Sequence, residues 1–248
     1  MRAFLPPVLP LSTLCLLAAT AHAQTTFSLG PTVGYNLATA AYQESRYAAG
    51  ATTASRSGLE AGLRALISRG HVSVQPALLY SQKGFTLNRT VSSFLGGNSS
   101  YTNQTHARLS YLILPVSVAY TQRATGSGAQ VFAGPYVGVL LGGTYDYSTV
   151  RTANGTALYE QGQGKVEFSD RYATTDPTDT RVYSQRLDAG LQGGAGYRLG
   201  STLLQLSYSV GLRNLNATYA LNQGSTPAPT YQNRAFQVAL TYVVGSSR

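Results

Sequence analysis

The chain has 248 residues, and only 11% of them are charged, against roughly a quarter in an average soluble domain. The net charge of +9 alone would allow a nucleic-acid partner, but the Arg residues are scattered singly and form no basic cluster. We therefore expect no nucleic-acid partner, and the low charge calls for an environment other than bulk water.

The first 23 residues have the pattern of a secretory signal peptide. Arg2 precedes an apolar stretch that runs to Ala19, and Ala21-His22-Ala23 has the small-residue spacing of a cleavage site. Three prolines at positions 6, 7 and 10 leave an apolar stretch shorter than the roughly 20 residues that a membrane-spanning helix needs. Cleavage after Ala23 would remove Cys15 and leave one domain, 24–248, without disulfides or thiolate metal ligands.

Residues 24–248 alternate apolar with small or polar residues, which is the period of a β-strand. In 27–37, for example, the apolar residues take the odd positions, and the segments are about as long as a membrane-crossing strand of ~9–11 residues. The pattern is least clear in 130–144, where Phe132 and Tyr136 compete with Val131 and Val137 for the apolar face. The segments expected to be strands are 27–37, 59–67, 72–81, 108–122, 130–144, 185–199, 202–213 and 234–244.

The connections between these segments alternate between short and long. The short ones are Arg69-Gly70, 125–129 and Gly200-Ser201, whereas 38–57, 83–107, 145–184 and 214–233 are long and rich in Asn, Thr, Ser, Gly and Tyr. Outer-membrane barrels have short periplasmic turns and long extracellular loops, so the chain has their layout. A hairpin inside 145–184 would raise the strand count to ten, but 157–168 lacks a lipid-facing stripe and is expected to extend beyond the membrane.

The short turns also predict how neighbouring strands pair. A two-residue turn at Gly200-Ser201 places Leu199 opposite Thr202 and collects the apolar residues of both strands on one face. A slip by one residue would mix the two faces, so this register is well specified. It also places Asp188 directly opposite Arg213, where an ion pair is expected.

The turn at Arg69-Gly70 can be treated in the same way. If these two residues form the turn, Ile67 pairs with Val72 and Arg64 pairs with Gln75. Apolar residues again fall on one face and polar residues on the other. Both turns therefore predict antiparallel hairpins with one apolar face.

These patterns predict an all-β fold, a closed antiparallel up-and-down transmembrane β-barrel of eight strands. Lipid offers no hydrogen-bond partner to the backbone, so every N–H and C=O group must be paired within the protein. Strands therefore cross a membrane only within a closed barrel. The alternative is a secreted β-sandwich or lipocalin-like barrel, which would bury its apolar face inward. The partners expected of the membrane fold are the outer-membrane bilayer, the barrel-assembly machinery and an extracellular partner at the loops. Aromatic girdles are predicted at Phe27, Tyr35, Tyr80, Tyr120, Tyr197, Phe236 and Tyr242.

Charged residues on the inward face are the candidate functional residues. We favour the interpretation that they fill and rigidify the lumen, which gives a structural or surface-interaction protein whose long loops meet partners. The alternative is a narrow small-solute channel, in which four Arg against two carboxylates would prefer anions. The predicted lumen charges are Glu60, Arg64, Arg186, Asp188, Arg198 and Arg213.

Little in the sequence points to an enzyme. His71 and His106 are expected at opposite ends of the barrel, whereas a Ser-His-acid hydrolase needs three groups within hydrogen-bond reach. A lipid-modifying barrel enzyme that uses His106 therefore remains the least favoured alternative. Two distant His and no Cys predict no metal site, and no cofactor motif is present.

The chain resembles the PorT-like family, a porin-family outer-membrane β-barrel domain of Gram-negative bacteria, along nearly all of 24–248. The resemblance implies an outer-membrane, cell-surface location, and it implies no particular activity because a fold does not carry a function. The chain departs from the family at Ala77 and Ile113, where the family usually has Glu. The segments that carry the resemblance are GPTVGYNLA (30–38), QPALLYSQKG (75–84), YLILPVSVAY (111–120), FAGPYVGVLL (132–141) and LSYSVGLRNLN (206–216).

Overall fold

The structure is a computed structural model that describes residues 25–43, 51–93, 99–153, 155–169, 171–172, 181–219 and 230–245. The expected signal peptide, 1–23, and its cleavage site lie outside these residues. Within them, no helix has the length and apolar character needed to cross a membrane.

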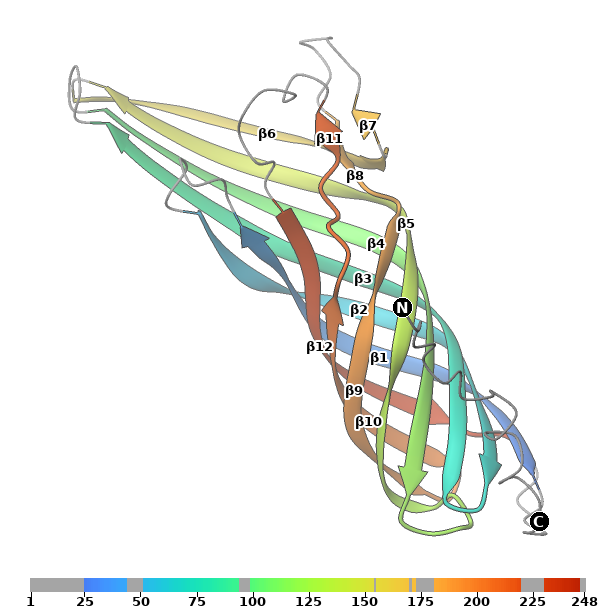
Figure 1. Cartoon of the computed structure of the whole chain (residues 1–248). Coiled ribbons are helices and arrows are strands. Elements are labelled where there is room, and N and C mark those ends of the chain that lie inside the picture. Colours follow the sequence, from blue (N-terminus) through green and yellow to red (C-terminus); the bar gives the residue numbers. More distant parts are fainter. Residues whose placement is uncertain are drawn as a thin grey trace, which may run out of the picture.

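Eight strands form a closed antiparallel ring, which confirms the predicted barrel (Figure 1). Neighbours in sequence pair with one another around the ring, and the ring closes where the last strand pairs with the first. The strands are β1 (Thr26–Gln43), β2 (Ala51–Arg69), β3 (Val72–Ser93), β4 (Ser99–Thr121), β5 (Gly128–Ala153), β9 (Leu187–Leu199), β10 (Thr202–Gly211) and β12 (Thr230–Tyr242).

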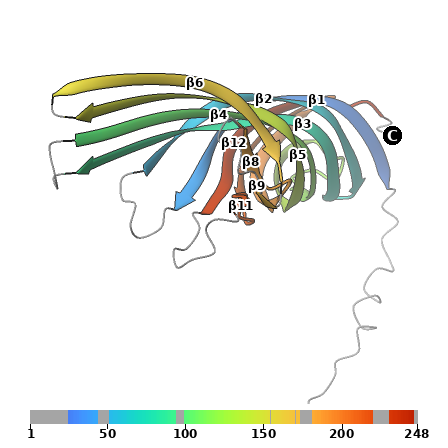
Figure 2. The ribbon, with the colours of Figure 1, turned by 90° about the horizontal axis from the view of Figure 1, so that it is seen from above.

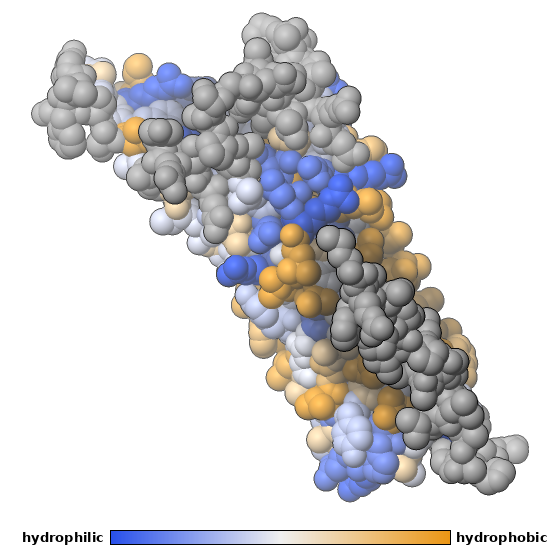
Figure 3. Space-filling view, in the orientation of Figure 1, coloured by the Kyte–Doolittle hydropathy of each residue, from blue (hydrophilic) through white to orange (hydrophobic). Residues whose placement is uncertain are grey.

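The apolar side chains point away from the barrel and the polar ones into it. Leu59 is 64% exposed and Val118 is 55% exposed, whereas Gln75 and Ser117 are fully buried in the lumen. Figure 3 shows apolar side chains gathered over the barrel, with hydrophilic ones at its turn end and near its loop end. A soluble barrel would bury the apolar set, so the outward-facing interpretation is confirmed.

Glycines on β9 explain which residues of its neighbour β5 face into the lumen, the question that the sequence pattern left ambiguous. Val131 and Val137 face outward, and Phe132 and Tyr136 are buried in the lumen. An added Cβ at Gly194 would lie 2.9 Å from Cζ of Phe132, and one at Gly190 would lie 2.8 Å from Cε1 of Tyr136. These glycines therefore make room for two rings inside the barrel.

One predicted register is confirmed and the other is wrong by two residues. Leu199 pairs with Thr202 as expected, so Gly200-Ser201 is the turn. At the other turn, however, Arg69 pairs with Val72, so the turn residues are Gly70 and His71. Gly70 has φ of +59°, which suits a tight hairpin turn, and β3 is shifted so that Ile67 pairs with Val74. A shift of two residues keeps every side chain on its face, and the predicted faces are therefore correct.

Three of the predicted long loops, 38–57, 83–107 and 145–184, are largely strand. β3 and β4 stay paired out to Ser93 and Ser99, and β5 continues to Ala153. β6 (Thr156–Phe168) pairs with this outer part of β5, and β8 (Val182–Ser184) runs parallel to the end of β6. β6 is outside the ring of eight, so the hairpin in 145–184 adds no membrane strand. A small parallel pair, β7 (Arg171–Tyr172) and β11 (Thr218–Tyr219), lies in the same region.

We call the extension the projecting sheet: β6 together with β3, β4 and β5 beyond the row Lys83, Leu109 and Gly143. Figures 1 and 2 show it leaning away from the barrel axis. From Lys83 to Ser93 it runs about 34 Å, at about 3.4 Å per residue. Polar side chains lie on both of its faces, so the backbone ladder continues while the alternation of apolar residues disappears. That is why these segments resemble loops in the sequence.

Candidate functional site in the barrel lumen

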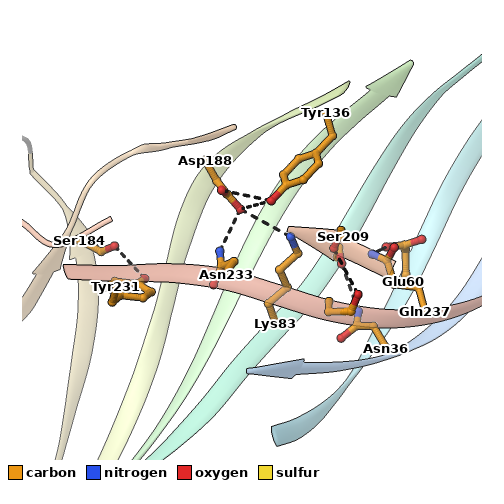
Figure 4. A network of polar contacts seen from close by, with 12 residues as sticks. Asn36, Glu60, Lys83, Tyr136, Ser184, Asp188, Ser209, Tyr231, Asn233 and Gln237 are labelled. Atoms are coloured by element: carbon orange, nitrogen blue, oxygen red, sulfur yellow. Dashed lines mark hydrogen bonds and ion pairs between the residues drawn. The ribbon is translucent and has the colours of Figure 1, made fainter. Parts of the chain in front are cut away.

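A buried ion pair between Lys83 on β3 and Asp188 on β9 lies in the lumen, at its loop end (Figure 4). Lys83 Nζ lies 3.6 Å from Asp188 Oδ2, and the two side chains are 1% and 0% exposed. Tyr136 on β5 donates its hydroxyl to both carboxylate oxygens at 3.3 Å, and Asn233 on β12 donates its Nδ2 to Oδ2 at 2.9 Å. The carboxylate is thus held by three strands besides its own.

Aromatic rings complete the surroundings of the ammonium group. Lys83 Nζ lies 4.9 Å from the ring centre of Tyr136 and 5.7 Å from that of Tyr111, both within the range of a cation–π attraction. Tyr111 is itself fully buried. A buried charge is tolerated only when it is paired and hydrogen-bonded, and this arrangement provides both conditions. Its chemical role is to hold opposite walls of the barrel together and to fill the space between them.

Two further buried charges of opposite sign lie on β2. Glu60 and Arg64 are 6% and 5% exposed, and Gln237 Nε2 donates to Glu60 Oε2 at 3.4 Å. The Nε and Nη1 atoms of Arg64 make no hydrogen bond within the structure. Ala77 is the cross-strand partner of Arg64. The position at which the PorT-like sequences usually have Glu therefore lies directly opposite this guanidinium.

Layers of glutamine and threonine fill the lumen toward the turn end. Gln75 on β3 donates to Gln130 on β5 and accepts from Gln205 on β10, both at 3.0 Å. Thr32 and Thr241 are hydrogen-bonded at 2.8 Å across the closing strand pair. All five side chains are buried. The cross-section of the barrel is therefore bridged by protein side chains at several levels.

The remaining predicted lumen charges lie elsewhere. Arg198 is half-buried beside its own turn and donates its Nε to the Gly200 carbonyl at 3.1 Å. Arg186 is exposed, with its guanidinium 4.5 Å from the ring centre of Phe168. Arg213 is exposed and donates its Nε to Gln185 Oε1 at 3.1 Å.

The expected ion pair between Asp188 and Arg213 is therefore wrong. β10 ends at Gly211, so the inward alternation that the prediction relied on stops before Arg213. Lys83 takes its place from across the lumen. The sequence carries a signal for Lys83, because this residue continues the inward parity of Ser73, Gln75 and Ser81, but the predicted strand ends at Ser81 and Lys83 falls in the predicted long connection 83–107.

The balance of buried charges changes as a result. Glu60 and Asp188 are matched by Arg64 and Lys83, all four nearly inaccessible to solvent. The excess of arginine that suggested an anion preference is consequently not found among these buried lumen residues.

The aromatic residues predicted for the girdles all lie on the outer surface, between 40% and 61% exposed. One group is near the turns and the other near the loop end, at the two borders of the apolar surface. The turn-end group is Phe27, Tyr120, Tyr197 and Tyr242, and the loop-end group is Tyr35, Tyr80 and Phe236.

The two histidines lie at opposite ends of the molecule. His71 is in the β2–β3 turn, and His106 is on the projecting sheet with Nδ1 2.8 Å from Thr86 Oγ1. Asp146 is the cross-strand neighbour of His106, but the structure shows no hydrogen bond or ion pair between their side chains. Among the described residues no group of His, Cys, Asp and Glu is placed to hold a metal ion.

The projecting sheet carries polar groups on both faces. Arg108, Asp146 and Lys165 are exposed on one face. On the other, the Tyr147 hydroxyl donates to Glu160 Oε1 at 3.3 Å, and the negative charge of Glu160 raises the pKa of Tyr147. A sheet that is polar on both faces is suited to water rather than lipid.

Comparison with known proteins gives one family and several solved structures. Residues 22–217 match the family model described as "Outer membrane protein beta-barrel domain". The chain is similar to Ail, the attachment invasion locus protein of Yersinia pestis, solved with a heparin analogue: 7% identity, 88% of this chain, 99% of that chain and a TM-score of 0.35. It is also similar to the translocator domain of the autotransporter NalP from Neisseria meningitidis, with 11% identity, 89% of this chain and 89% of that chain covered, and a TM-score of 0.26. No match was found among curated proteins.

Proposed function

Because the chain belongs to the outer membrane protein beta-barrel domain family, we propose that it is a non-conducting surface protein of the bacterial outer membrane. Its barrel anchors the projecting sheet, and the sheet meets partners outside the cell. It catalyses no reaction, and its lumen is a packed core rather than a passage.

The observation that carries this proposal is the sealed lumen. Lys83 and Asp188 meet at its loop end with side chains at most 1% exposed, and hydrogen-bonded glutamines bridge it nearer the turns. A conducting pore needs a continuous water-filled path, as in the wide barrels of porins, whereas the interior of an eight-stranded barrel is just wide enough to be filled by side chains or to hold one small ligand. Transport through this barrel would require several buried hydrogen bonds to break at once.

The projecting sheet supports the surface role. It extends about 34 Å beyond Lys83 and presents charged groups on an ordered surface. Strands paired over this length keep side chains in fixed relative positions, as a recognition surface requires. Neither its length nor its polarity is needed to anchor the barrel.

Conductance in a planar bilayer tests the sealed lumen. We expect folded protein to give no current steps under conditions where a general porin conducts. Reproducible steps that change in size in Gln75→Ala, which shortens a lumen bridge, would refute the proposal, and their reversal potential would show which ions pass. A mock preparation from cells without the protein controls for contaminating porins.

Cysteine labelling in intact cells tests the position of the sheet. The sequence has one cysteine, Cys15, within the expected signal peptide, so introduced thiols are unique after cleavage. We expect Leu158→Cys, at an exposed site on β6, to react with a membrane-impermeant maleimide in intact cells. Arg123→Cys, in the turn after β4, should react only after lysis. The opposite result would place the sheet on the inner side and end its role as an external surface.

A further inference from the structure

A cavity of about 320 Å³ opens at the loop end of the barrel, at the base of the projecting sheet. Its lining residues come from β3 to β6 and from β8, β12 and β1. Neither the sealed lumen nor the outer part of the sheet accounts for it. Lining side chains include Phe85, Leu109, Tyr145, Val166, Tyr183 and Tyr231.

The walls of this cavity are aromatic and firmly packed. The Phe85 and Tyr231 rings are 5.5 Å apart and tilted by 47°, and the Tyr145 and Tyr147 rings are 6.3 Å apart and nearly parallel. Phe85 packs against two buried clusters, one around Leu109 and one around Tyr231. Its ring is therefore held in place from both sides. Rings arranged in this way favour another ring, which can stack or make edge-to-face contacts.

The described lining of the cavity is electrically neutral. Among the described residues that line it there is no Asp, Glu, Lys, Arg or His. Ser184 is already satisfied, because its hydroxyl donates to the Leu215 carbonyl at 3.0 Å and lies 3.2 Å from the Tyr231 hydroxyl. A charged ligand would lose its hydration here without gaining a partner.

We propose that this cavity binds one neutral aromatic molecule of one or two fused rings. An apolar cavity of about 150 Å³ is known to hold benzene, so about twice that volume suits two fused rings. A flat ligand would insert over Ala107, between the Phe85 and Tyr145 side chains that flank it in the same cross-strand row, with its edge toward Tyr231. Binding would occur on the extracellular side and is independent of whether the lumen conducts.

The test is a titration of the folded, full-length protein with 2-naphthol. The chain has 18 Tyr and no Trp, so energy transfer from tyrosine to bound naphthol can be measured without tryptophan emission. We expect saturable quenching with one molecule per chain. 1-Decanol, which has the same number of carbon atoms but no ring, should compete at least tenfold more weakly.

Variants connect the signal to the cavity and separate it from uptake by detergent. Ala107→Phe places a ring inside the cavity and should weaken naphthol binding at least tenfold. Ala157→Phe makes the same change at an exposed site on β6 that does not line the cavity, and should leave binding unchanged. Phe85→Leu keeps an apolar wall but removes the ring, and should weaken naphthol more than decanol. Heat-modifiable gel migration shows that each variant is folded.

Three results would overturn the proposal. The first is no saturable binding by the folded wild-type protein. The second is binding that Ala107→Phe leaves intact or, should that variant not fold, binding that Phe85→Leu leaves intact. The third is decanol binding as tightly as naphthol, which would assign the cavity to acyl chains instead.

Discussion

Removal of the charge at Asp188 should strongly destabilise the barrel. In Asp188→Asn, Lys83 keeps a buried ammonium group without a counter-charge. Coulomb's law gives about 4 to 5 kcal/mol for two unit charges 3.6 Å apart at an effective dielectric constant of about 20. Breaking a buried pair from one side typically costs about 3–5 kcal/mol, and we expect a loss in that range for the free energy of unfolding.

A second ion pair in the same molecule provides a matched control. Arg181 and Glu167 are also 3.6 Å apart, but their side chains are 48% and 46% exposed. Distance alone would predict the same energy for both pairs. Because water screens the exposed pair and each charge remains solvated, Glu167→Gln should cost no more than about 1 kcal/mol.

The measurement is equilibrium unfolding in urea of the barrel refolded into lipid vesicles, followed by heat-modifiable gel migration. Lys83→Met combined with Asp188→Asn should recover most of the stability lost in Asp188→Asn, because the double variant buries no unpaired charge. If Asp188→Asn costs no more than Glu167→Gln, the lumen pair does not brace the barrel. The reasoning about the sealed lumen would then be wrong.

Two further comparisons use the same assay. Gly194→Ala should cost about 1–3 kcal/mol, because its Cβ would meet the Phe132 ring and the opposite backbone, whereas Gly193→Ala should be nearly neutral because its nearest contacts are 3.5 Å or longer. Equal losses would show that Gly194 does not make room for that ring. Leu114→Arg should cost about 2–4 kcal/mol at a lipid-facing site, and Leu158→Arg on the projecting sheet about nothing. A similar cost at both sites would contradict the membrane border that we draw between them.

The sequence by itself was sufficient to predict which way every barrel strand except β5 faces. Lipid requires apolar side chains on the outer face, and the narrow lumen requires small or polar ones on the inner face. The residue types of Val72 and Ser73 therefore indicate which face each occupies, without information from any other strand. The closed, eight-stranded barrel follows, because strands with such faces have no other way to satisfy their backbone in lipid. The Gly200-Ser201 turn could likewise be predicted from neighbouring residues alone, and the register of the two strands that it joins is confirmed.

Only the tertiary structure decided which inward residues meet. Lys83 and Asp188 belong to strands that are not neighbours in the ring, so their contact depends on the stagger of strands around the whole barrel. The extra pairing of β3 to β6 was hidden for a related reason, since in water neither face of a strand has to be apolar. Alternation reports the surroundings of a strand, whereas contacts across a lumen and strand pairing in water depend on where the rest of the chain lies.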